Sequence, residues 1–88
     1  MENKPITLKH PFDHEGKKIE TVTFKERLKG KDLLASEAEM QARNIVNPGD
    51  ATRTLYLVSR ATGLEPEVLE EMDLADYLGL AEKANGFL

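Results

Sequence analysis

The sequence predicts an α+β fold, with an N-terminal β-hairpin followed by three to four α-helices in a small helical C-terminal half. Two patterns of apolar residues in the sequence support this prediction. Apolar and polar residues alternate in the first part of the chain, which is the period of half-buried strands, and apolar residues recur at helical spacing from about residue 30 onward. A chain of 88 residues fits a single domain, 1–88, with a hairpin part over 1–29 and a helical part over 30–88.

The hairpin is predicted from two alternating stretches, 5–12 and 17–25, joined by a polar turn over 13–16. The inward side of the first strand is formed by Ile6, Leu8, His10 and Phe12. We therefore expect His10 to be partly buried and His14, in the turn, to be exposed. Ile19 has the opposite parity to Val22 and Phe24, which predicts a bulge or a late strand start there.

The first helix is predicted from Gly30 to Val46, with Asp32 or Ser36 as its N-cap. Its apolar side would be a broad stripe made of Leu33, Leu34, Ala38, Ala42, Ile45 and Val46. Pro48 cannot continue this helix, and Asp50 is a suitable N-cap for the next one.

Three further helical segments follow. Residues 51–62 end at a C′ glycine, Gly63, and residues 65–72 form a short helix with Pro66 at its first position. Asp73 then caps a last helix, which Gly86 closes. Met40 and Met72 occupy apolar helical positions and are expected to fill the core.

Helices 51–62 and 74–85 each carry two apolar rows, which is more apolar surface than a core of this size readily buries. Either three helices pack tightly on one another, or one row is reserved for a partner helix. On the second interpretation the partner-binding residues are Leu57, Leu64, Val68, Tyr77, Leu78, Leu80, Phe87 and Leu88.

The residue types argue against an enzyme. There are no cysteines and only two histidines, and no motif pairs Ser36 or Ser59 with either histidine. The six glycines are scattered and form no phosphate-binding loop. The carboxylates between residues 65 and 76 lack the spacing of a calcium loop. We therefore expect no catalytic residues, no cofactor and no bound metal.

Charge is distributed unevenly along the chain. Residues 1–31 carry a net charge of +3 and residues 32–88 a net charge of -7. An acidic helical half argues against nucleic acid as the main partner, because phosphate contacts need clustered cations. The apolar runs are too short to span a bilayer, and no hydrophobic signal core follows Met1. We expect no membrane association and a location in the cytoplasm.

Motifs in the second half of the chain occur in a specific order. The run Leu55-Tyr56-Leu57-Val58-Ser59-Arg60-Ala61-Thr62-Gly63-Leu64 is followed by Pro66-Glu67-Val68, by Asp76-Tyr77-Leu78-Gly79-Leu80-Ala81-Glu82 and by the ending Gly86-Phe87-Leu88. This pattern resembles the tail assembly chaperones of long-tailed phages and of Mu-like and P2-like prophages, the protein E-like family. The resemblance is strong over residues 50–88 and looser before them, and residues 35–47 depart from it.

The resemblance implies a chaperone that coats the long, apolar, helical tape measure protein and keeps it soluble until tail tube subunits polymerise around it. It implies a location in the cytoplasm of the bacterial host and absence from the mature virion. The tail tube protein is a possible second partner, and the chain a possible homo-oligomer. A frameshift in such genes often yields a longer form.

Two other functions fit parts of the sequence. A small DNA-binding or antitoxin-like regulator would use the basic hairpin region, but Arg43, Arg53 and Arg60 are isolated and give no helix a cationic face. A minor structural subunit that stays in the tail is the other alternative.

Overall fold

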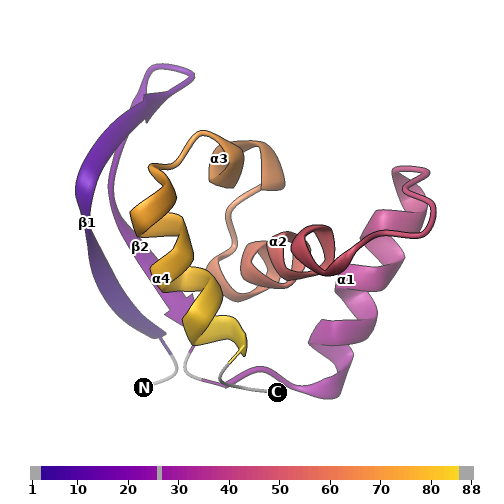
Figure 1. The fold of residues 1–88 in the computed structure, drawn as a ribbon. Helices are drawn as coiled ribbons and strands as arrows, with labels where there is room; N and C mark the ends of the chain where they lie inside the picture. Colours follow the sequence, from indigo (N-terminus) through magenta and orange to yellow (C-terminus); the bar gives the residue numbers. More distant parts are fainter. Residues whose placement is uncertain (1–2, 26, 86–88) are drawn as a thin grey trace.

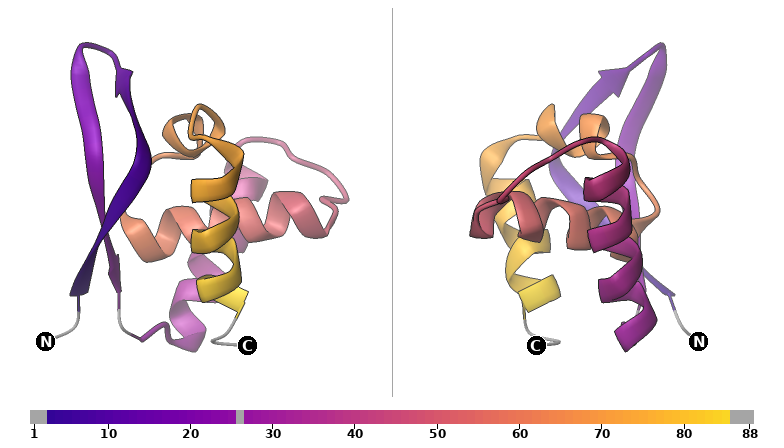
Figure 2. Two further views of the ribbon diagram at one scale, coloured as in Figure 1. Left: turned by 60° about the vertical axis from the view of Figure 1, so that its left-hand side comes forward. Right: turned by 90° about the vertical axis from the view of Figure 1, so that its right-hand side faces the viewer.

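The computed structural model describes residues 3–25 and 27–85, and it contains a β-hairpin followed by four helices (Figure 1). The elements are β1 (Asn3–His14), β2 (Lys17–Lys25), α1 (Gly30–Ala42), α2 (Asp50–Thr62), α3 (Pro66–Glu70) and α4 (Leu74–Asn85). The predicted α+β fold is therefore confirmed. α1 and α4 stand on either side of α2, and α4 lies next to the hairpin (Figures 1 and 2).

The hairpin turn is tighter than the sequence predicts. Strand pairing continues to His14 and Lys17, so the turn consists of Glu15 and Gly16 alone. Both have positive φ angles, 50° and 81°, as a two-residue type I′ turn requires. Such a turn matches the twist of the two strands that it joins.

The bulge that the parity of Ile19 predicts is present beside this residue, and its extra residues lie on the opposite strand, β1. Thr7 pairs with Thr21 and Phe12 pairs with Ile19, so the unpaired residues lie between Thr7 and Phe12. Leu8 at the start of this segment is buried, but His10 is exposed, which corrects its predicted partial burial. The bulge breaks the strict alternation from which that burial was inferred.

The hydrophobic core lies where the hairpin, α2, α3 and α4 meet. Phe24 of β2, Val58 of α2 and Ala84 of α4 are completely buried in it. The remaining members of this cluster are Leu8, Val22, Leu57, Ala61, Leu69, Met72, Leu80 and Ala81. The predicted burial of Met40 and Met72 is confirmed.

α1 uses the opposite side from the one that its sequence predicts. Its buried residues are Asp32, Ser36 and Met40, spaced one turn apart, whereas Leu33 and Leu34 are exposed. Of the remaining predicted stripe, Ala38, Ala42 and Val46 are exposed and Ile45 is half-buried. The predicted apolar stripe is therefore wrong, because polar contacts decide which side of α1 meets α2.

α1 also ends earlier than predicted, at Ala42 rather than Val46. Asn44 adopts a left-handed conformation with φ of 62°, and its N–H donates to the carbonyl of Gln41. The N–H of Ile45 donates to the carbonyl of Met40 at 2.9 Å. These two bonds form a Schellman motif, which ends a helix without proline or glycine.

The helix caps agree only partly with the sequence. Asp73 caps α4 as predicted, because its carboxylate accepts the N–H of Ala75 at 3.0 Å. Lys29 and Gly49, however, hold the N-cap positions of α1 and α2. Asp32 and Asp50 instead lie inside the first turns of these helices, and Ser36 lies further along α1. The predicted closure of α4 by Gly86 falls outside the described residues.

Candidate functional site

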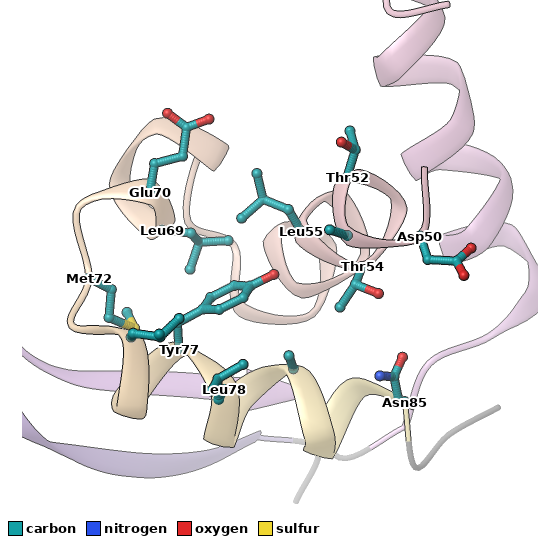
Figure 3. Close-up of a pocket in the computed structure, with 13 residues that line it drawn as sticks. Asp50, Thr52, Thr54, Leu55, Leu69, Glu70, Met72, Tyr77, Leu78 and Asn85 are labelled. Atoms are coloured by element: carbon teal, nitrogen blue, oxygen red, sulfur yellow. The ribbon is translucent and has the colours of Figure 1, made fainter. Parts of the chain in front are cut away.

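An apolar groove of about 740 Å³ lies between the first half of α2, the α3 segment and α4 (Figure 3). Its α2 wall includes Ala51 and Leu55, and its α4 wall includes Leu74, Tyr77 and Leu78. Leu69 and Met72, from α3 and the turn after it, line the end next to the α4 N-terminus. The groove therefore joins segments that the loops 63–65 and 71–73 bring together.

The groove exists because α4 carries two apolar rows and the core uses one of them. Leu80 and Ala84 point into the core, and Leu80 is only 1% exposed. Leu74 and Leu78, one helical turn apart, remain 67% and 54% exposed. Two neighbouring leucines with this exposure form an apolar patch that a folded monomer does not need. Of the two explanations for the surplus rows, this geometry favours a surface for a partner.

Tyr77 extends across the groove from α4. Its ring reaches toward Leu55 and Thr54 on α2, with the hydroxyl at the far end (Figure 3). Partial burial raises the pKa of the Tyr77 phenol above its usual value of 10.0, so this hydroxyl stays protonated at neutral pH. The Tyr77 hydroxyl is thus a hydrogen-bonding group between the apolar side chains of α2 and α4.

Carboxylates stand at opposite ends of the groove. Glu70 lies at the α3 end and Asp50 at the end formed by the start of α2 (Figure 3). Both are exposed, and among the described residues neither has an ion-pair partner. The described residues that line the groove include no lysine and no arginine. The local charge is therefore negative.

Arg43, at the C-cap of α1, and the two arginines of α2 are all paired with carboxylates. Arg43 pairs with Glu67 at 2.5 Å and with Glu39 at 3.0 Å. Arg53 pairs with Glu37, and Arg60 donates from Nε to Asp32 at 2.8 Å. These pairs hold α1 against α2 and α3.

Two polar contacts tie the hairpin to the edge of the groove. Nδ1 of His14 lies 3.1 Å from a carboxylate oxygen of Glu71, in the turn before α4. This hydrogen bond with Glu71 raises the pKa of His14 more than desolvation lowers it. The His14 side chain is only 19% exposed, which corrects the exposure predicted from its place near the turn.

The second contact is made by Asp76 of α4. Its two carboxylate oxygens accept the backbone N–H groups of Lys9 and His10, at 3.1 and 2.9 Å. These N–H groups belong to the bulge and have no strand partner there. Desolvation raises the pKa of Asp76, but the two N–H groups together lower it more, and the net direction is downward. Asp76 thereby fixes the start of α4, where Leu74 and Tyr77 form one wall of the groove.

The predicted partner-binding residues are distributed between core and surface. Leu78 is exposed, Leu64 and Tyr77 are half-buried, and Phe87 and Leu88 lie outside the described residues. Leu57, Val68 and Leu80 are buried and can affect a partner only through the packing beneath it. Of the described residues in the predicted set, only Tyr77 and Leu78 line the groove.

The sequence-based choice missed Leu55 and Leu74 as well as the two end carboxylates, Asp50 and Glu70. Leu74 belongs to the same helical row as Tyr77 and Leu78, and that spacing was a usable signal. The position of Asp50 opposite Glu70 depends on the loops that bring α2 and α3 together, and no local pattern encodes it.

Within residues 3–25 and 27–85, no group of three His, Asp or Glu side chains is placed to hold a metal ion. In the same part of the chain, no helix has the length and apolar character needed to cross a bilayer.

A protein-family model described as "Phage tail assembly chaperone proteins, E, or 41 or 14" matches residues 5–88. The matched range includes every described residue that lines the groove. No curated protein and no solved structure matches the chain significantly. The family match confirms the resemblance inferred from the motifs of the second half.

Proposed function

The chain belongs to the phage tail assembly chaperone family, and from this premise we propose that it binds the tape measure protein and keeps it soluble during tail morphogenesis. The observation that carries the proposal is the apolar groove with its exposed leucines, Leu74 and Leu78. A groove of this kind fits the apolar face of a helix. A tape measure protein is a long helical chain with such faces until the tail tube encloses it.

Many copies along one tape measure chain would act together. Each groove offers a small contact area, and repeated weak contacts on one ligand give a high overall affinity. The net charge of -4 would add solubility to the coated complex. In this proposal the role is non-catalytic and belongs to the host cytoplasm. The tail tube protein is the second candidate partner, and a homo-oligomer is the candidate arrangement of the copies on the ligand.

Co-expression with the tape measure protein from the same phage genome tests the proposal. We expect most of the tape measure protein in the soluble fraction when the wild-type chain is present and in the insoluble fraction when it is absent. Leu78→Asp should fail to solubilise it, with folding of the variant checked by circular dichroism. A tape measure protein that stays insoluble beside the wild-type chain would remove the main support for the proposal.

Absence from the finished particle separates a chaperone from a structural subunit. We expect mass spectrometry of purified tails to detect the tail tube and tape measure proteins but not this chain. Its presence at a fixed ratio would favour the alternative of a minor structural tail subunit.

The ion pairs of α1 and α2 weigh against a DNA-binding or antitoxin-like role. Arg43, Arg53 and Arg60 are each bound to carboxylates, so these helices offer no free guanidinium for phosphate. Retention of the protein on DNA at moderate salt would overturn this argument.

A further inference from the structure

We infer that the groove selects an amphipathic helix that carries lysine or arginine on both sides of its apolar stretch. This inference rests on the proposed function, since it concerns the same groove, and it adds a charge pattern that the occupant must have. The inference is based on the positions of Asp50 and Glu70 at opposite ends of an apolar surface (Figure 3).

The shape of the groove favours a helix as the occupant. The exposed anchors, Leu74 and Leu78, are one helical turn apart on α4, and Leu55 lines the α2 wall of the same groove. The walls are helices whose backbone groups are already bonded, so the groove offers no strand edge for an extended peptide. A helix laid along such walls buries its apolar face on the leucines and leaves its flanks at the ends of the groove.

The charges at the ends favour cations on those flanks. Among the described residues, neither Asp50 nor Glu70 forms an ion pair. Arg53, which lines the neighbouring depression, is paired with Glu37, and the Lys83 ammonium lies 5.9 Å from the centroid of the Phe24 ring. An occupant with acidic flanks would meet two unpaired carboxylates, whereas basic flanks would form two new ion pairs.

The same charges argue against a second copy of this chain as the occupant. Residues 32–88 carry a net charge of -7, so another copy would bring an acidic helical surface to an acidic groove. Like charges at both ends would oppose that association. The fit is with a partner of opposite charge.

Two synthetic helical peptides test the inference. They share one central leucine-rich face and differ only in their flanks, which are lysines in one peptide and glutamates in the other. Each ion pair at an exposed site is worth about a two- to fivefold change in affinity at low salt. We therefore expect the wild type to bind the lysine-flanked peptide about tenfold more tightly in fluorescence anisotropy, with the preference shrinking in 0.5 M NaCl (about a 4 Å screening length).

Variants of the carboxylates at the two ends of the groove test whether these residues cause the preference for the lysine-flanked peptide. Asp50→Asn with Glu70→Gln should abolish the preference, and Asp50→Lys with Glu70→Lys should reverse it. The matched control, Asp13→Lys with Glu20→Lys, makes the same change in net charge on the hairpin and should leave the preference largely intact. Equal binding of both peptides by the wild type, or a control that acts like the groove variants, would overturn the inference.

The outcome is separable from that of the proposed function. If the tape measure protein is kept soluble but the peptides show no charge preference, the chaperone role stands and the charge selection is wrong. Sedimentation that reveals a dimer disrupted by Leu78→Asp, with no peptide bound, would assign the groove to a second copy and also overturn the inference.

Discussion

Asp32 is the buried carboxylate on which the attachment of α1 depends. It accepts the Lys29 backbone N–H at 2.8 Å and the Arg60 Nε–H at 2.8 Å, and the Lys25 ammonium lies 3.5 Å away. The Lys29 N–H and the two cations lower the pKa of Asp32 to about 2, although burial acts in the opposite direction. One side chain thus joins β2, the start of α1 and the end of α2.

The Asp32→Asn variant tests this role. The amide cannot form the charged pairs, and charged hydrogen bonds are worth about 1.5–3 kcal/mol. We expect the free energy of unfolding at pH 7, measured with urea, to fall by about 1–3 kcal/mol. Glu82→Gln, an exposed change on α4, should alter it by less than about 0.5 kcal/mol.

The pH dependence of the same variant has a defined sign. The folded pKa of Asp32 lies below its ordinary value of 3.8, so its carboxylate stabilises the fold fully above about pH 4. That contribution is lost as the pH falls from about 4 to about 2. Asp32→Asn should therefore weaken the loss of stability in this window, and an unchanged acid profile would contradict the assigned role.

The buried side of α1 could not be predicted from its sequence. Leu33 and Leu34 lie in an apolar stripe by spacing, yet both are exposed, whereas Asp32 and Ser36 are buried. Burial of Asp32 is possible because Arg60 and Lys25 come from distant segments to neutralise it. A periodicity argument cannot anticipate partners that only the tertiary fold supplies.

At the scale of elements, the β1 bulge and α4 depend on each other. The bulge leaves the N–H groups of Lys9 and His10 without a strand partner, and Asp76 accepts both. These two hydrogen bonds link the bulge to α4, so loss of the Asp76 carboxylate should loosen the hairpin and α4 together. The position of the groove wall should also depend on the Asp76 contacts, because Leu74 and Tyr77 lie close to Asp76 on α4.

The Asp76→Ala variant measures the coupling. We expect the amide hydrogens of Lys9 and His10 to exchange at least about tenfold faster, because their acceptor is gone. Glu82→Ala on the exposed side of α4 is the matched control and should leave both rates unchanged. Unchanged exchange in Asp76→Ala would contradict the coupling of the bulge to α4.

The elements themselves were largely predictable, because their signals are local. Gly16 at the turn, Gly63 with φ of 76° after α2 and Pro66 at the start of α3 each act within a few residues. The Schellman ending at Asn44 was not predicted, and the bulge was predicted beside Ile19 but not on β1. Asn44 is only a weak signal for a left-handed residue, and the bulge depends on the distant Asp76 carboxylate.

On the scale of the whole molecule, the order of elements explains the groove. The hairpin, α2 and one row of α4 contribute residues to the hydrophobic core. α1 packs on the far side of α2 (Figure 2). Leu74 and Leu78, in the other row of α4, then remain exposed. The sequence predicted the surplus row but not which residues form it, because the packing of α2 on α4 decides which leucines become core.

If the groove holds a helix of the tape measure protein, as proposed, a substitution in the groove should weaken binding more than the same substitution elsewhere. Two leucine variants allow this comparison. Leu78 lines the groove, whereas Leu34 is 70% exposed on α1 and does not line it. Leu78→Asp and Leu34→Asp therefore make the same chemical change on exposed leucines at two sites. Burying a leucine contributes about 1.5–3 kcal/mol, or about a 10- to 100-fold change in affinity.

We predict that overlapping soluble fragments of the tape measure protein include some that bind the wild type. For those fragments, Leu78→Asp should raise the Kd at least about tenfold, and Leu34→Asp should leave it within about twofold. Equal losses in the two variants, or a loss only in Leu34→Asp, would contradict the assignment of the groove as the binding site.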